Sequence, residues 1–117
     1  MTTTQWTILF SSLAGKVWQT TISTGDTSAP LGLDNNLADQ VAVQIIGTIS
    51  GSTVVVQGSL DATNYATVAD RNGNAMSYTV IGNLIGIGPS IVRLQIAVTG
   101  GSAAGLTVNV FVPQQTR

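Results

Sequence analysis

The sequence lacks cysteine, histidine and glutamate, and Lys16 is its only lysine. Without cysteine there is no disulfide and no thiolate ligand, and without histidine there is no imidazole base or metal ligand. A Ser-His-Asp arrangement cannot form, and a Ser-Lys pair would depend on one lysine that stands in no supporting motif. We therefore expect a protein that is not an enzyme and that holds no metal and no cofactor.

Charge is also scarce, at 8% of 117 residues, with four basic and five acidic side chains and a net charge of -1. Binding of nucleic acid needs several cations on one face, so we expect none. Apolar residues make up 44%, yet no apolar run approaches the ~18 residues that cross a bilayer. The stretch 6–10 is too short, and lacks a preceding positive charge, for a signal peptide. We expect no membrane partner and a protein used in a cytosol or in a particle assembled there.

The polar residues that are present are mainly threonine, serine, glutamine and asparagine. Their side chains form hydrogen bonds without the large desolvation cost of a charge, which suits a surface that another protein covers. A free monomer of this composition would also lack the net charge that keeps small domains apart. We expect an assembled state, and the alternative is a free neutral domain.

Two segments near the C-terminal end, 92–99 and 106–112, alternate apolar and other residues with a period of two. This period is expected for strands with one buried face. The connection between them contains three glycines, which can take the positive φ values that a tight turn needs. We predict that the two strands pair as an antiparallel hairpin.

A second hairpin is predicted from strands at 41–49 and 53–60 with a turn between them, and its second strand places Leu60 on the face of Val54 and Val56. The segments 41–48 and 92–99 also echo each other, as Val-x-Val-Gln-Ile-x-x-Thr and Val-x-Leu-Gln-Ile-x-x-Thr. Two apolar strands can match by chance. A structural repeat would instead give two equivalent hairpins in a two-sheet sandwich.

A third hairpin is predicted to join strands at 65–69 and 76–80. Its turn at 70–74 contains Asn72 and Gly73, the strongest short-range hairpin signal in the chain. A type I′ turn requires positive φ at both of its central residues, which asparagine and glycine tolerate.

Further strands at 7–10 and 17–23 bring the total to about eight, and glycines mark 81–89 as a loop. Short antiparallel strands joined by Gly, Asn and Asp turns are typical of a β-sandwich, and the jelly roll is the common eight-stranded form. The predicted fold class is all-β: an antiparallel, jelly-roll-like β-sandwich. The predicted organisation is an N-terminal arm or first strand at 1–16, the sandwich domain at 17–112, and a C-terminal tail at 113–117.

The aspartates are the only carboxylate side chains available for chemistry. Asp34 and Asp39 flank two asparagines and offer oxygen ligands for calcium, but an EF-hand loop needs a glutamate, and Asp-Asn runs are turn formers. Asp61 and Asp70 lie at opposite ends of a predicted strand, too far apart for a glycosidase pair. We interpret all four as turn residues.

Apolar residues near the N-terminus suggest an arm that docks on its own sheet or on a neighbouring subunit. The aromatic residues either close a small sandwich or stack on sugar rings, as in glycan-binding modules. The candidate partner-contact residues are Trp6, Ile8, Phe10 and Trp18, and the candidate glycan-stacking residues are Trp18 and Tyr65.

The runs 54–68, 70–75, 87–94 and 98–101 resemble small structural proteins of tailed-phage virions, which carry a Gly-Ser-x-Asp-Gly-Thr-Asn-Trp turn and a later Val-Arg-Leu strand. The resemblance covers roughly residues 41–112. This chain has Ala62 where glycine is usual and Tyr65 where tryptophan is usual. Discoidin-like, galactose-binding jelly rolls share a similar turn, in which Asp61 and Asn64 would fasten the backbone.

The resemblance implies a capsid decoration, or cement, protein that stabilises the shell by adhering to the major capsid protein. It implies a homotrimer on the outer capsid surface of a virion assembled in the host cytoplasm. The alternative is a carbohydrate- or receptor-binding β-sandwich module, as a head fibre or a tail component.

Overall fold

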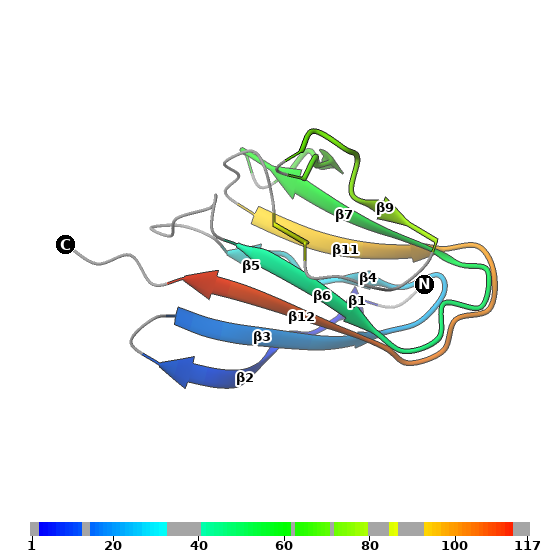
Figure 1. Cartoon of the computed structure of the whole chain (residues 1–117), viewed down its shortest axis with the longest axis horizontal. Helices are drawn as coiled ribbons and strands as arrows, with labels where there is room; N and C mark the ends of the chain where they lie inside the picture. Colours follow the sequence, from blue (N-terminus) through cyan, green and yellow to red (C-terminus); the bar gives the residue numbers. More distant parts are fainter. Residues whose placement is uncertain are drawn as a thin grey trace.

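The computed structural model describes residues 3–12, 15–32, 41–61, 63–70, 72–79, 85–86 and 93–113. These residues form twelve strands in two sheets, with no helix among them (Figure 1). The predicted class, an antiparallel β-sandwich of jelly-roll type, is confirmed. Six strands have five to eight residues and the other six have two each, which is why the sequence pattern indicated fewer.

The seven-stranded sheet, called sheet A, has the order β1-β4-β11-β7-β8, with β5 also paired to β11 and β9 to β7. The two-residue β1 and β4 pair in parallel, and the other pairs in both sheets are antiparallel. Its strands are β1 (Thr3–Thr4), β4 (Thr27–Ser28), β5 (Leu31–Gly32), β7 (Thr53–Ser59), β8 (Ala66–Thr67), β9 (Ser77–Tyr78) and β11 (Arg93–Thr99).

The five-stranded sheet, called sheet B, has the order β10-β6-β12-β3-β2. Residues 3–12, within the predicted arm, thus give one strand to each sheet, and β2 pairs with β3 of the same chain around a bulge between Ile8 and Phe10. The strands of sheet B are β2 (Thr7–Ser12), β3 (Gly15–Ile22), β6 (Ala42–Ile46), β10 (Ile85–Gly86) and β12 (Leu106–Pro113).

The core lies between the sheets and is built from the alternation that the sequence shows. Leu94, Ile96 and Val98 of β11 are buried, and the residues between them are only partly buried. The same period holds in β6, β7 and β12, whose inward side chains are mostly valine. Trp6, Trp18 and Tyr78 pack against this cluster from its margins.

The first two predicted hairpins are wrong, because each pair of strands is divided between the sheets. Strand β6 lies in sheet B and β7 in sheet A, while β11 lies in sheet A and β12 in sheet B. Alternation identifies which face of a strand is buried, but it does not say whether the next strand lies beside it or opposite it. The connections 47–52 and 100–105 cross the sandwich as arches, which are visible at the right-hand end of Figure 1.

The two arches are fastened to each other and to the turn after β3. The hydroxyl of the buried Ser52 donates to the carbonyl of Gly100 at 2.7 Å and accepts from the N–H of Ala103 at 3.1 Å. Thr24 hydrogen-bonds to the same serine hydroxyl at 2.7 Å. The backbone N–H of Thr24 also donates to the carbonyl of Ala103 at 3.0 Å. This cluster closes one end of the sandwich with neutral groups.

The internal echo corresponds to two equivalent units, β6-arch-β7 and β11-arch-β12. Strand β6 pairs with β12, and β7 with β11, so that exchanging the units preserves the pairing. Gln44 lies opposite Asn109 in one sheet, and Gln95 lies opposite Gln57 in the other. Each arch contains six residues. The repeat is therefore an arch joining the sheets rather than a hairpin within one.

The third predicted hairpin is also wrong as a pairing of 65–69 with 76–80, because β8 and β9 both pair antiparallel with β7 and so follow each other in the same direction along its edge. Between them, residues 69–75 form a small hairpin that the isolated antiparallel bridge between Ala69 and Ala75 closes. Its turn differs from the predicted type I′, because only Gly73, at φ +85°, has positive φ while Asn72 does not. The carboxylate of Asp70 accepts from the N–H groups of Asn72 and Asn74 at 2.8 and 3.0 Å, which supports a wider turn. The predicted loop at 81–89 lies outside the described residues, apart from β10.

Candidate partner-binding face

The outer face of sheet B carries an apolar row that crosses four strands. The strand register places Phe10 opposite Val17, Val17 opposite Phe111, and Phe111 opposite Ala42. Side chains of directly paired residues project from the same face. Since Val110 and Val112 are buried in the core, Phe111 and its row must face outward.

This row is accessible. Phe10 is 67% exposed, and a hollow of about 310 Å³ lies beside Phe111. Ile46, further along β6 on the same face, is 46% exposed. Large apolar side chains gathered on a polar-rimmed surface are typical of a protein contact. The hollow is lined by Val17, Ala42, Gln44, Asn109 and Phe111.

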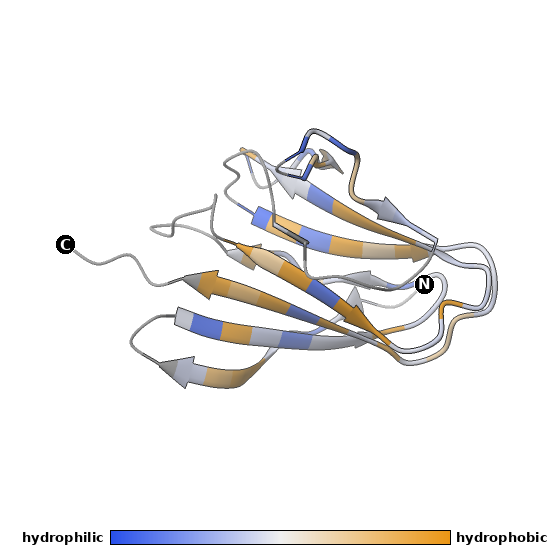
Figure 2. Cartoon of the chain, viewed as in Figure 1, coloured by the Kyte–Doolittle hydropathy of each residue, from blue (hydrophilic) through white to orange (hydrophobic). Residues whose placement is uncertain are grey.

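A row of amides borders the apolar row. The side chain of Gln19 donates to that of Asn109 at 2.9 Å, and Asn109 donates to Gln44 at 3.2 Å. These bonds hold three flexible side chains across β3, β12 and β6. Figure 2 shows hydrophilic bands, in blue, on these strands. Fixed amides at a contact surface lose less conformational freedom when a partner covers them.

The described part of this face bears no charge. Lys16, the charged residue of sheet B within the described ranges, pairs with Val112 and Ser11 and so lies on the opposite side of the sheet from Val17. A partner covering the face would therefore bury no described charged group of this chain. Burial of an uncharged surface avoids the desolvation penalty that ions carry.

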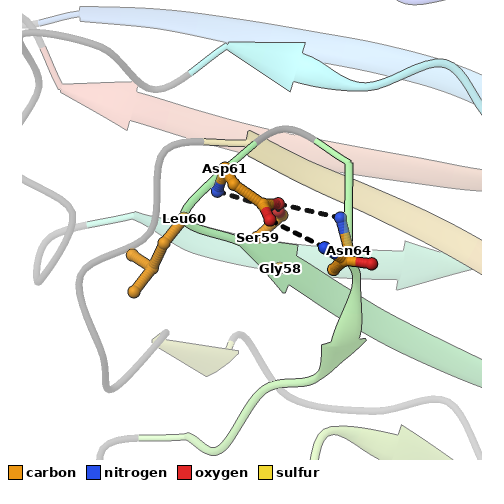
Figure 3. Close-up of a pocket in the computed structure, with 5 residues that line it drawn as sticks. All are labelled: Gly58, Ser59, Leu60, Asp61 and Asn64. Carbon is orange, nitrogen blue, oxygen red and sulfur yellow. Dashed lines mark hydrogen bonds between the residues drawn. The ribbon is translucent and has the colours of Figure 1, made fainter.

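A second hollow, of about 320 Å³, lies at the end of β7 beside Asp61 (Figure 3). The Asp61 carboxylate accepts from the N–H groups of Asn64 and Thr63, at 2.8 and 2.9 Å, from the Asn64 side chain at 2.7 Å and from the Ser59 hydroxyl at 2.8 Å. These donors, the Asn64 N–H foremost, hold the pKa of Asp61 well below its usual range. Asp61 and Asn64 thus fasten the turn, as expected.

Leu60 is 74% exposed at this hollow, so its predicted place on the face of Val54 and Val56 is wrong. Strand β7 ends at Ser59, and the turn bound to Asp61 takes the chain out of the pleat before Leu60. The hollow is lined by Gly58, Ser59, Leu60, Asp61 and Asn64.

The four predicted contact residues fall in two groups. Ile8 and Phe10, on β2, are 48% and 67% exposed. The Trp6 and Trp18 side chains pack against the core, and the Trp6 indole N–H donates to the carbonyl of Ala29 at 2.6 Å.

The two predicted glycan-stacking residues lie on different parts of the sandwich. Trp18 is in β3 of sheet B, and Tyr65 precedes β8 of sheet A. The hydroxyls of Tyr65 and Tyr78 are buried with no hydrogen-bond partner in the described structure. Burial, reinforced by Asp70, raises the pKa of Tyr78.

No group of three or more potential metal-ligating side chains occurs within the described ranges. The predicted turn at Asp34 and Asp39 lies outside them. Asp61 and Asp70 both serve as acceptors within turns, which confirms their interpretation as turn residues. The described residues also contain no helix that is long and apolar enough to cross a membrane.

Comparison with known proteins reveals similarity of fold. No protein-family profile and no curated protein matches the sequence. The SPBc2 prophage-derived protein YomS superposes with a TM-score of 0.57 over 84% of this chain and 95% of its own, at 8% identity. A cupin-family protein with a double-stranded β-helix fold from Methanocaldococcus jannaschii gives a TM-score of 0.54 over 95% and 81%, at 14% identity. The chain thus belongs to the jelly-roll class of β-sandwich, and one of its structural neighbours derives from a prophage.

Sequence reasoning found Phe10 but missed the other members of the row. Phe111 and Val17 occupy the odd positions of strands whose even positions fill the core, so alternation assigned them to the outside without grouping them. Which outward residues become neighbours depends on strand pairing, which the incorrect hairpins obscured.

Proposed function

We propose that this protein is a virion structural protein, and specifically a capsid decoration protein that stabilises the shell by adhering to the major capsid protein. The observation that carries the proposal is the uncharged outer face of sheet B, with its apolar row beside hydrogen-bonded amides. The prophage origin of a protein with a similar fold supports a phage context.

The mechanism is adhesion rather than chemistry, and we propose that the protein is not an enzyme. Phe10 and Phe111 would insert between side chains of the capsid surface, while the amide row would exchange hydrogen bonds with it at the rim. Large aromatic side chains dominate the energetics of such contacts.

We propose further that the protein acts as a homotrimer on the outer surface of a capsid assembled in the host cytoplasm. A stable interface buries at least about 1,000 Å² in total. Several copies in one oligomer bind in concert, so that modest contacts add through effective concentration.

The test is cosedimentation of the full chain with undecorated shells of its phage, at low and at high salt. We expect binding that persists at high salt, because an uncharged interface is not screened, and an increase in the temperature at which the shells burst. Phe10→Ser is expected to weaken binding about tenfold, as for a central aromatic contact.

Val55→Ser is the matched control, since Val55 lies on the outer face of sheet A and is only partly buried. It should leave binding unchanged. Failure of the wild-type chain to sediment with the shells would overturn the proposal. Equal weakening of shell binding by Phe10→Ser and Val55→Ser would show that the outer face of sheet B is not the contact surface.

A further inference from the structure

The Asn72–Gly73 pair plays no part in the proposed interface, yet it is chemically distinctive. Both residues are exposed at the tip of the hairpin that joins β8 and β9. Gly73 has no side chain to shield its backbone nitrogen, and it adopts φ +85°. The described residues make no hydrogen bond to the Asn72 side-chain amide, so its carbonyl carbon is open to attack.

We propose that Asn72 is a site of spontaneous deamidation, and that the turn held by Asp70 sets the rate. The backbone nitrogen of Gly73 attacks the side-chain carbonyl carbon of Asn72, forming a C–N bond and closing a succinimide ring. The bond from that carbon to the side-chain nitrogen breaks, and the nitrogen leaves as ammonia with the proton lost by Gly73. Water then opens the ring at either carbonyl, to give aspartate or isoaspartate.

The other asparagines are less suited to this reaction. Asn72 is the one asparagine in the sequence that precedes glycine. Asn64 precedes a tyrosine, and its amide donates to Asp61 at 2.7 Å. The Asn109 side chain is held between two glutamines on a strand that pairs on both sides. A bulky following residue hinders attack, and a fixed amide cannot rotate toward the backbone.

The folded turn restrains the nucleophile. The N–H of Gly73 donates to the carbonyl of Asp70 at 3.0 Å, so this nitrogen is engaged in the closed turn. The Asp70 carboxylate holds the turn closed through its bonds to the N–H groups of Asn72 and Asn74. Reaction therefore requires the hairpin tip to open, and loss of the Asp70 side chain would open it more often.

The product would change the hairpin and leave the apolar row of sheet B intact. A carboxylate at position 72 would change the net charge from -1 to -2 and would stand beside Asp70. Isoaspartate would also add a methylene group to the main chain, next to the bridge between Ala69 and Ala75. Both changes would loosen this small hairpin, which lies between the two strands that pair with the edge of β7.

The experiment is incubation of the folded full-length protein in ¹⁸O-labelled water, followed by digestion and mass spectrometry of each asparagine. We expect the label to accumulate faster at position 72 than at any other asparagine, and Asn72→Gln to abolish this signal. Label at position 72 no greater than elsewhere would overturn the proposal.

Two variants test the control by Asp70. Asp70→Ala should accelerate labelling several-fold toward the rate of the urea-unfolded chain, whereas Asp70→Asn, which keeps an oxygen acceptor, should stay close to wild type. An unchanged rate in Asp70→Ala would overturn the proposal. So would equal acceleration in both variants, because the charge rather than the turn would then set the rate. A thermal melt of each variant shows whether faster labelling comes from opening of the turn at Asn72 alone, with the melting temperature little changed, or from unfolding of the whole chain.

Discussion

The two units β6-arch-β7 and β11-arch-β12 share a scaffold and differ in the residues that occupy equivalent positions of the two sheets. On the outside of sheet B, Ala42 lies opposite Phe111, and at the equivalent position of sheet A, Arg93 lies opposite Ser59. The register around both pairs is the same, with an amide pair two residues away. The fold therefore does not require an apolar row at this position, and the proposed contact would explain why sheet B has one.

The units also differ where their arches meet. A methyl group on Gly101 would collide with the backbone of Gly51 and Ser52 and would lie 2.6 Å from the Ser50 carbonyl oxygen. A methyl group on Gly51 would meet only the Cα atom of Gly101, at 3.8 Å. One arch is thus inserted against the backbone of the other, and the equivalence of the units ends at this contact.

Replacement of Gly101 is expected to have the largest effect on stability, and comparison with Gly51 tests whether the two arches differ. We expect Gly101→Ala to destabilise the fold by roughly 3 kcal/mol or more, since it combines a left-handed conformation, at φ +58°, with overlap against backbone that cannot move aside. Gly51→Ala should cost only about 1–2 kcal/mol, from its positive φ. Urea unfolding of both variants measures the difference, and equal losses would show that the arches are not interlocked in this way.

The serines of the two arches offer a second contrast. Ser52→Ala would remove a buried hydroxyl that bonds the carbonyl of Gly100 and the N–H of Ala103, and would leave the Thr24 hydroxyl as the side-chain partner of both groups. We expect a loss of about 1 kcal/mol, the usual net worth of a hydrogen bond. Ser102 is exposed in the other arch, and Ser102→Ala should change stability by less than about 0.5 kcal/mol. Thermal melts of the pair provide the measurement, and similar melting temperatures would contradict the interpretation.

The fold could be predicted from the sequence as far as local signals reach. Alternation in β11 and β12 identified both strands and their buried faces, because burial imposes a period of two on each strand separately. Which sheet receives each strand depends on long-range packing across the core. The glycines of 100–105 suit a hairpin turn and an arch equally well, and the contact between Gly101 and the other arch is encoded in no local pattern.

The candidate face was predictable only in part. The exposed apolar side chains of β2 signalled a contact region near the N-terminus, and Phe10 proved to be the most exposed residue of the row. Its partner Phe111 is distant in sequence and is brought to it through two strand pairings, which the sequence does not specify. Trp18 shows the opposite case, because its side chain packs against the core.

The proposed role of the apolar row can be tested by placing on sheet B the charged residue that sheet A carries at the equivalent position. Ala42→Arg would place a charge at the position equivalent to Arg93, beside Phe111 in the hollow. We expect binding to capsid shells to weaken at least tenfold, about 1.4 kcal/mol, because the buried charge would lack a partner. Val55→Arg on sheet A is the control and should bind normally. Cosedimentation reports the result, and unimpaired binding of Ala42→Arg would move the contact to another surface.

The smallest effect is expected from substitution of Asp61, in the turn after β7. This substitution tests how the stability of the unit β6-arch-β7 responds to acid. The pKa of Asp61 is lower in the folded chain than its unfolded value of about 3.9, so its carboxylate stabilises the fold above that pH and loses this effect as the pH falls. Asp61→Asn should therefore melt below wild type at about pH 6, and the gap should narrow as the pH falls to about 2. Ser59→Ala, which removes one of the donors to the carboxylate, should shift the same profile less. Melting temperatures across this range provide the measurement; a gap that stays constant with pH would mean that Asp61 acts through its shape in the turn and not through its charge.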